Sequence, residues 1–205
     1  MDAAEDGRPR PLEWGAAMRP RAGEADAGDL AVVTRNARGT LVAAIDGAGH
    51  GVEAARAARS GADVVRRYAG DDLFALVVRC HEVLRPTRGA AMSLAFFPED
   101  LSAMTWLGIG NVEGRVFGGN GSDHRPKSAL RLANGVVGHV LPTVTRETLE
   151  LRRGDVVVFA TDGIGGSFLD SHRPVGSPQE IADRIVRDHW KPTDDGLVLV
   201  VRYLG

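Results

Sequence analysis

Three apolar, β-forming runs in this chain adjoin an aspartate, and this pattern limits what the chain can fold into. The runs are residues 41–45 before Asp46, residues 156–161 before Asp162, and residues 197–201 after the pair Asp194-Asp195. A carboxylate at the mouth of a buried strand is costly unless it pairs with a donor or binds a cation. The pattern favours a layered β structure whose acidic turns meet at one end. Taken singly, each Asp-Gly pair is also typical of an ordinary turn.

The residue types in these turns suit a divalent metal ion. Mg²⁺ and Mn²⁺ prefer hard oxygen ligands completed by water, and carboxylates supply such oxygens. Glycine follows Asp46 and Asp162, and a residue without a side chain lets the backbone turn sharply and offer its carbonyl to an ion. Asp29, at the end of the acidic segment 24–29, is a candidate for holding metal-bound water.

The rest of the chain alternates short apolar runs with turn residues, which predicts an α+β layered domain. Strands are expected over residues 12–18, 30–34, 40–45, 90–97, 102–108, 114–117, 128–132, 145–151, 156–160 and 196–204. Helices are expected over residues 52–68, 72–84 and 178–189, the last capped by Ser177. Residues 1–11 are expected to form a flexible tail, residues 12–205 a single domain, and the Gly-rich loop 118–127 a mobile flap.

Composition excludes several classes of protein. The 25 Lys and Arg against 27 Asp and Glu give a formal net charge of −2, so the chain lacks the basic footprint of a nucleic-acid binder. No apolar run approaches the length of a transmembrane helix, and no membrane association is expected. The one cysteine, Cys80, excludes an internal disulfide or a thiolate metal cluster and is expected to be buried in a helix. A cytoplasmic location fits these features.

Five groups of motifs occur in a fixed order along the chain. They are Gly23-Glu24 with Gly28-Asp29; Ile45-Asp46-Gly47-Ala48-Gly49-His50-Gly51; Gly108-Ile109-Gly110-Asn111-Val112-Glu113; Gly154-Asp155 with Thr161-Asp162-Gly163-Ile164; and Thr193-Asp194-Asp195. In this order they resemble the metal-dependent Ser/Thr protein phosphatases of type 2C (the PPM family). The nearest branch is the bacterial sporulation stage II E / RsbX-like phosphatases. The resemblance spans roughly residues 12–203.

The resemblance implies a four-layer αββα sandwich, with two antiparallel sheets flanked by helices and a binuclear Mn²⁺ or Mg²⁺ site at one end. Asp46 would bridge both ions, and the Gly47 carbonyl would complete the shell of one of them. Asp162 and Asp194 would hold the other ion, and Asp29 would act through water. Asp46, Asp162 and Asp194 are therefore the expected catalytic residues.

Some positions depart from the family pattern or leave a choice. The first aspartate of the last motif is the family's ligand, so Asp194 is favoured over Asp195. Asn111 stands where many relatives have an aspartate that supports a third ion, which argues against a strong third site. The phosphate-binding arginine of the eukaryotic members has no clear counterpart. Arg19 and Arg21 lie nearby in the sequence and are expected to be surface charges.

The activity implied by the resemblance is hydrolysis of phosphoserine or phosphothreonine by a metal-bound hydroxide that attacks phosphorus in line. The expected substrate is a phosphorylated bacterial stress or sigma-factor regulator, such as a stressosome or anti-sigma-pathway component. Two alternatives stay open: a catalytically silent metal-binding interaction module of the same fold that binds a phosphorylated regulator, and a hydrolase of small phosphomonoesters. His50 is expected to have a structural role at a helix start, with catalytic acid or metal ligand as alternatives.

Overall fold

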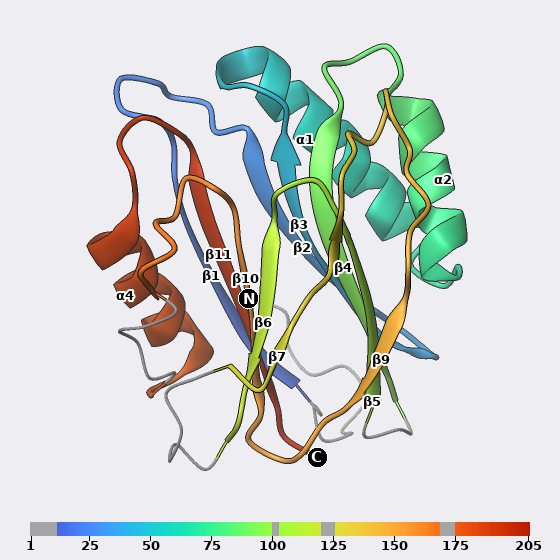
Figure 1. Ribbon diagram of the computed structural model, residues 1–205, viewed down its shortest axis with the longest axis vertical. Coiled ribbons are helices and arrows are strands. Elements are labelled where there is room, and N and C mark those ends of the chain that lie inside the picture. Colours follow the sequence, from blue (N-terminus) through green and yellow to red (C-terminus); the bar gives the residue numbers. More distant parts are fainter. Residues whose placement is uncertain (1–11, 100–102, 120–125, 169–174) are drawn as a thin grey trace.

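Two β-sheets packed face to face form the centre of the computed structural model (Figure 1), which describes residues 12–99, 103–119, 126–168 and 175–205. The tail predicted over residues 1–11 lies outside the described residues, as does most of the flap predicted over residues 118–127. No helix in the described part of the chain is long and apolar enough to cross a membrane.

The first sheet has five strands in the order β1-β11-β10-β6-β7, and all its neighbours are antiparallel. These strands are β1 (Leu12–Arg19), β6 (Glu113–Phe117), β7 (Ser128–Ala129), β10 (Val156–Ala160) and β11 (Gly196–Tyr203). The antiparallel pairing of β10 with β11 places the end of β10 beside the start of β11. The two acidic turns that flank these strands are therefore neighbours in space.

The second sheet has six strands, with the path β2-β3-β4-β5-β8 and with β9 also paired to β5. These strands are β2 (Asp29–Asn36), β3 (Gly39–Gly47), β4 (Ala90–Pro98), β5 (Ala103–Ile109), β8 (Leu132–Ala133) and β9 (Glu147–Glu150). The sheet is antiparallel except for the short parallel pair of β5 with β8, a departure from the purely antiparallel sheets expected. Asp46 is the second-to-last residue of β3, and its direct partner in β2 is Asp29.

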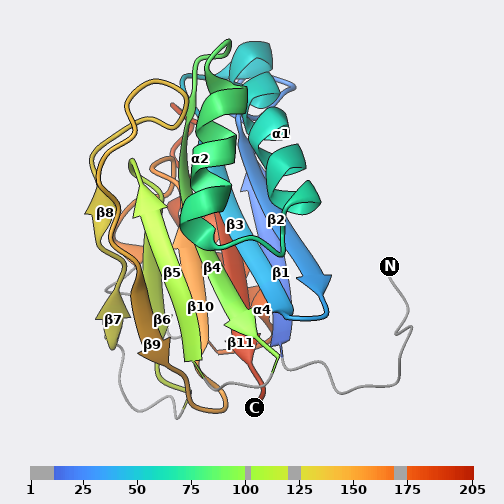
Figure 2. The same ribbon diagram turned by 90° about the vertical axis from the view of Figure 1, so that its right-hand side faces the viewer.

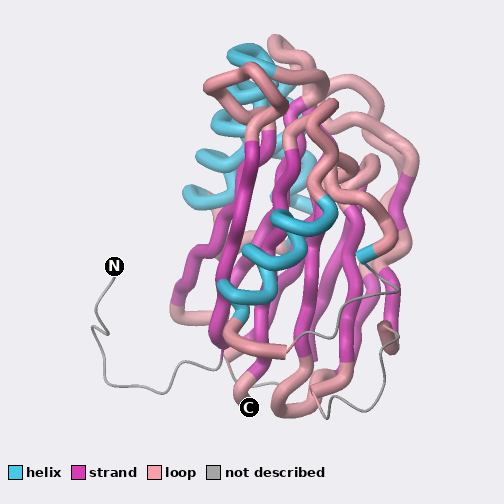
Figure 3. Tube along the Cα trace, turned by 90° about the vertical axis from the view of Figure 1, so that its left-hand side faces the viewer, coloured by secondary structure: helices cyan, strands magenta, loops and turns pink. Residues whose placement is uncertain are grey.

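Helices cover both outer faces of the sandwich. α1 (Gly51–Arg67) and α2 (Leu73–Leu84) lie against the second sheet (Figure 2), and α4 (Pro178–His189) lies against β1 and β11 of the first sheet (Figure 3). α4 begins with a capping box, because Ser177 accepts from the Glu180 N–H and the Glu180 side chain accepts from the Ser177 N–H. The four-layer αββα architecture expected from the sequence is confirmed.

Alternation along β3 determines where its last side chains point. Leu41, Ala43 and Ile45 pack under α1 and α2, whereas Val42 and Ala44 pack between the sheets. Successive side chains of a strand point to opposite faces, so Asp46 continues the series of the inward-facing residues. The core between the sheets also contains Trp106 and Phe159, whose rings meet edge to face with centroids 6.5 Å apart. The candidate functional site described below lies at one end of this apolar core.

One predicted strand was wrong. Residues 128–132 form two short strands in different sheets, because β7 pairs with β6 of the first sheet and β8 pairs with β5 of the second. Leu130 lies between them, buried in the core between the sheets, and its N–H donates to the Gly114 carbonyl at 2.9 Å. Burial of this one side chain makes the chain cross from one sheet to the other. The strand predicted over residues 145–151 is also shorter, because only Glu147–Glu150 are paired.

Candidate functional site

A pocket of about 600 Å³ opens at the end of the sandwich where the acidic turns meet. It is lined by residues from every part of the chain: Arg21, Asp46, Ala48, Gly49, His50, Ala91, Gly110, Asn111, Asn134, Gly135, Val136, Asp162, Thr193 and Asp194. The three aspartates expected to be catalytic, Asp46, Asp162 and Asp194, therefore line the same pocket. They come from the end of β3, the turn after β10 and the turn before β11.

Asp46 stands among like charges. Burial raises its pKa to about 9, and the carboxylates of Asp29, Asp162, Asp194 and Asp195 add repulsion in the same direction. An acidic group this strongly perturbed holds its proton at neutral pH unless a cation compensates the charge. A carboxyl group with a strongly shifted pKa inside a pocket marks a candidate functional site.

Asp29 is the cross-strand neighbour of Asp46 but is not among the lining residues. Its side chain is buried, and its Oδ2 accepts from the Thr161 hydroxyl at 2.7 Å. Burial raises the pKa of Asp29 to about 7, although the Thr161 hydrogen bond acts in the opposite direction. The Thr161 hydroxyl also accepts from the Leu197 N–H at 2.8 Å. Through Thr161, Asp29 is therefore connected to the end of β10 and the start of β11 in the first sheet.

The two residues of the Asp194-Asp195 pair have different environments. Asp194 lines the pocket, and burial and the neighbouring Asp162 raise its pKa, whereas the Asp195 N–H and Arg21 lower it. Asp195 is 3% exposed, and its two carboxylate oxygens accept from the N–H groups of Arg21 and Gly28, each at 2.8 Å. Asp195 thus binds backbone groups, and Asp194 is the member of the pair that is available to a ligand.

Asp162 is exposed, and two donors hold it in place. The side-chain amide of Asn111 donates to its Oδ2 at 2.6 Å, and the Lys191 ammonium donates to its backbone carbonyl at 2.7 Å. The chain reaches Asn111 through Gly110, whose φ of +92° lies in the left-handed region that favours glycine. The neutral Asn111 therefore donates a hydrogen bond to Asp162, whereas an aspartate at position 111 would repel the Asp162 carboxylate.

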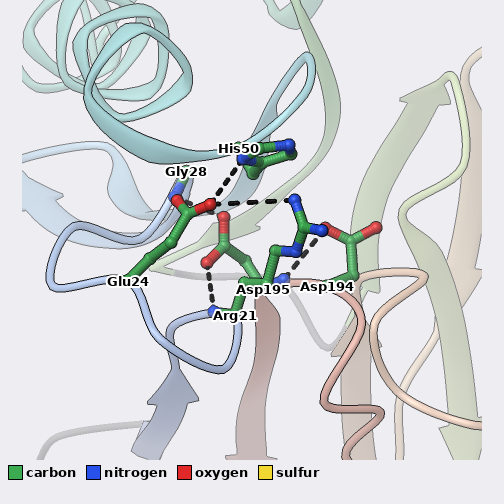
Figure 4. A network of polar contacts seen from close by, with 6 residues as sticks. All are labelled: Arg21, Glu24, Gly28, His50, Asp194 and Asp195. Atoms are coloured by element: carbon green, nitrogen blue, oxygen red, sulfur yellow. Dashed lines mark hydrogen bonds and ion pairs between the residues drawn. The ribbon is translucent and has the colours of Figure 1, made fainter.

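A polar network joins Glu24 to Arg21 and His50 (Figure 4). The Glu24 carboxylate lies 2.6 Å from Nδ1 of His50 and 3.7 Å from the Arg21 guanidinium, and both of these partners line the pocket. Its second oxygen, Oε2, is buried without a hydrogen-bond partner among the described residues. His50 is the residue before α1, but its side chain does not cap the helix; it contacts Glu24 instead.

Sequence reasoning therefore missed part of the site. Arg21, expected to be a surface charge, is 36% exposed and also lines the pocket, whereas the Arg19 guanidinium lies over the Trp190 ring, 5.4 Å from its centroid. Asn134 and Thr193 also line the pocket, and no motif pointed to Asn134. Arg21 and Glu24 carried a weak signal, because they precede Asp29 in a segment rich in charge and glycine.

The donor set fits a divalent cation. The pocket offers carboxylate oxygens from three turns, and their mutual repulsion is what a bound cation would remove. Within the described residues, no three histidine, cysteine, aspartate or glutamate side chains form a ready-made site for one ion. Water would therefore complete the coordination, as is usual for Mg²⁺ in proteins.

Comparison with known sequences identifies the family. The model of the family "Stage II sporulation protein E (SpoIIE)" matches residues 36–204. The phosphoserine phosphatase RsbX of Bacillus subtilis (strain 168) is 22% identical over 183 residues, which are 89% of this chain and 90% of RsbX.

Solved structures share the fold. A chain from a study of the bacterial stressosome, described as a modular system adapted to control secondary messenger signalling, is 26% identical with a TM-score of 0.83. The match covers 93% of this chain and 99% of that one. RsbX in complex with magnesium is 19% identical with a TM-score of 0.80, over 94% of this chain and 95% of RsbX. With a family model that matches residues 36–204 and a fold shared along nearly the whole length, the chain belongs to the SpoIIE family of type 2C phosphatases.

Proposed function

We propose that this protein is a metal-dependent protein phosphatase that hydrolyses phosphoserine or phosphothreonine on a regulatory protein. The observation that carries the proposal is the convergence of Asp46, Asp162 and Asp194 on one pocket from three distant turns. Carboxylates that converge on one pocket repel one another, and two divalent cations would relieve that repulsion. Family membership and the relationship to RsbX support the same activity.

The resemblance supplies the residues that would hold the ions, and the presence of Asp46, Asp162 and Asp194 in one pocket supports this assignment. Asp46 would bridge two ions, either Mn²⁺ or Mg²⁺, with the Gly47 carbonyl completing one shell and Asp162 and Asp194 holding the other ion. Asp29 would act through water, since its side chain is not among the lining residues and is bonded to Thr161. When bound, two such ions lower the pKa of water and neutralise charge on phosphoryl oxygens.

The chain's own residues would bind and orient the phosphoryl group. Arg21 is the one cationic side chain that lines the pocket in the described part of the chain, and a guanidinium fork matches the oxygens of a phosphate. Asn111 and Asn134, which also line the pocket, add neutral donors. Glu24 restrains Arg21 and His50 together, so the rim that receives the phosphorylated side chain is organised before substrate arrives.

We infer that the substrate is a phosphorylated component of a stress-regulatory assembly. RsbX is named as a phosphoserine phosphatase, and a structure sharing this fold comes from a study of the bacterial stressosome. Both matches cover about nine tenths or more of this chain. A phosphorylated stressosome or anti-sigma-pathway protein is therefore the substrate class to test first.

The decisive experiment compares hydrolysis of a chromogenic phosphomonoester and of a phosphoserine protein by wild type and Asp162→Ala. Each is assayed with Mn²⁺, Mg²⁺ or chelator. We expect metal-dependent turnover that disappears with Asp162 and persists in Asp63→Ala, a control on an α1 side chain that is 79% exposed. Folded wild-type protein that binds the phosphoprotein without hydrolysing it under any condition would replace the proposal with a silent binding module. Turnover of the small ester alone would indicate a small-molecule hydrolase.

A further inference from the structure

We propose that Asp195 is a positioning residue of this site, because its carboxylate fixes both ends of the segment 21–28 against the motif that carries Asp194. The Arg21 N–H donates to Oδ1 and the Gly28 N–H donates to Oδ2, each at 2.8 Å. These contacts join residues that are 174 and 167 positions apart in the sequence. The inference deepens the proposed function and rests on it, since it assigns a role to a residue of the same site.

An asparagine could not reproduce the hydrogen bonds that the Asp195 carboxylate makes. Its side chain is 3% exposed, and each of its two oxygens takes one backbone N–H. Hydrogen bonds to a charged acceptor are about twice as strong as neutral ones. Leaving a buried acceptor or donor unpaired is destabilising, because the group loses its hydrogen bond to water without gaining another. An asparagine has one acceptor oxygen and so cannot accept from both N–H groups in this geometry.

Each of the two bonded N–H groups leads to an element of the pocket. Arg21 carries the guanidinium that lines the pocket. The Gly28 carbonyl accepts from the Gly47 N–H at 2.9 Å, so the Gly28 peptide connects Asp195 to the residue whose carbonyl we expect to complete a metal shell. Figure 4 shows Asp195 between Arg21 and Gly28, with its own N–H directed to Asp194. Asp195 therefore connects Arg21, which we expect to bind the substrate phosphate, to Gly47, whose carbonyl we expect to bind a metal ion.

The packing around Asp195 leaves little space for adjustment. A Cβ added at Gly28 would lie 2.7 Å from the Ala54 Cβ and 3.1 Å from Asp195 Oδ2. A Cβ added at Gly163 would lie 1.7 Å from the Asp195 carbonyl oxygen. The backbone thus approaches Asp195 closely from both sides, and both approaches depend on glycine. The carboxylate is confined to the position from which it reaches Arg21 and Gly28.

The first test needs no variant. In uniformly labelled wild-type protein, couplings across hydrogen bonds should connect the Arg21 and Gly28 amide nitrogens to the Asp195 side-chain carboxyl carbon. Both amides should exchange slowly with solvent. Absent couplings together with fast exchange at both amides would overturn the inference. These readouts do not depend on turnover, so they are distinguishable from a failure of the proposed phosphatase activity.

The second test compares Asp195→Asn with Asp155→Asn. Asp155 is a matched control because it is 2% exposed and also accepts from backbone N–H groups, those of Gly119 and Arg152, away from the pocket. Asp195→Asn should speed exchange at Arg21 and Gly28 and lower kcat/KM by about 10–100-fold, as loss of a supporting partner does at metal sites. Asp155→Asn should leave both exchange rates and kcat/KM unchanged. Equal effects of the two variants would reduce Asp195 to a general stability residue.

A double-mutant cycle then tests the link to Arg21. If Asp195 acts by placing Arg21, then Asp195→Asn should raise KM for the phosphoprotein less in the Arg21→Ala background than in wild type. Residues in one network show such non-additive energies, whereas independent sites add. Additive effects on KM would contradict a positioning role for Asp195 toward Arg21.

Discussion

Asp29 of β2 and Asp46 of β3 are direct cross-strand partners, and this pairing opposes two carboxylates at the end of the sheet. Side chains that are directly opposite in an antiparallel pair lie on the same face, and like charges there are destabilising. Burial is the largest cause of the raised pKa at both residues, and it brings the pKa of Asp29 to about 7 and that of Asp46 to about 9. The fold accepts this cost at the place where the proposed cations bind.

The pairing predicts how the metal-free protein responds to pH. An unfolded aspartate has a pKa of about 3.9. Because the folded-state pKa values are higher, the contribution of these two groups to stability is complete below about pH 4 and is lost as pH rises through about 7 and about 9. In chelator, the free energy of unfolding in urea should therefore fall between about pH 5 and about pH 9.

Two comparisons complete this experiment. Asp46→Asn should remove most of the pH dependence, because the group with the higher pKa no longer titrates. Adding Mn²⁺ or Mg²⁺ to the wild-type protein at the alkaline end of the range should raise its free energy of unfolding again. A ligand that binds only the folded state stabilises that state. A stability of the metal-free protein that stays constant or rises over this pH range would contradict the proposed carboxylate pair.

Asp46→Asn should also reduce turnover severely. The substitution keeps the size of the side chain but removes the charge that would bridge two ions. Metal catalysis is worth several kcal/mol and each 1.36 kcal/mol is a factor of ten, so we expect kcat/KM to fall by roughly 10²–10⁴-fold. Titration calorimetry with Mn²⁺ should show a parallel loss of metal binding. Asp63→Asn on α1 serves as the surface control, and full activity in Asp46→Asn would rule out the assigned role.

Asn111 offers a different test, because it donates to Asp162 at 2.6 Å without being an expected ligand itself. Asn111→Ala should weaken metal affinity or activity by about 10–100-fold, the usual effect of losing a partner that orients a metal ligand. Asn111→Asp should place a second negative charge against Asp162 and shift half-maximal activity to higher metal concentration. Metal titrations of both variants check this, and an unchanged midpoint in each would show that the hydrogen bond does not orient Asp162.

Most of the architecture could be predicted from the sequence because local signals and packing agree. Ser177 and Pro178 fix the start of α4, and the alternation of β3 follows from the two apolar faces that it must bury. The split of residues 128–132 could not be predicted. Leu130 is one apolar residue in a short run, and only the presence of both sheets determines that the chain crosses between them there.

The site was predictable where chemistry and spacing coincide and not where it depends on long-range hydrogen bonds. The Asp-Gly turns indicated Asp46 and Asp162 as candidate site residues. The order of the strands places both in one pocket. The preference for Asp194 over Asp195 came from the family resemblance alone, because the N–H groups of Arg21 and Gly28 that bind Asp195 are remote in sequence. A pair of adjacent aspartates contains no local signal of which one turns toward the backbone.

The glycine of the Asp162-Gly163 turn gives the last prediction. A Cβ at Gly163 would lie 1.7 Å from the Asp195 carbonyl oxygen, and backbone on both sides must shift to accept it. Gly166, three residues further along, has no atom of the described residues within 4 Å of its added Cβ and serves as a matched control.

Gly163→Ala should destabilise the protein by about 1–3 kcal/mol, the usual cost of overpacking, and should lower activity because Asp162 and Asp195 move apart. Gly166→Ala should leave activity intact and change stability little, with a gain of up to about 1 kcal/mol from the restricted unfolded chain. Urea denaturation and phosphatase assays on both variants make the comparison. Gly163→Ala could instead prove as stable and as active as Gly166→Ala. The site would then not require the close approach of the Asp162-Gly163 and Asp194-Asp195 turns, and other contacts would have to hold Asp162 and Asp194 in the same pocket.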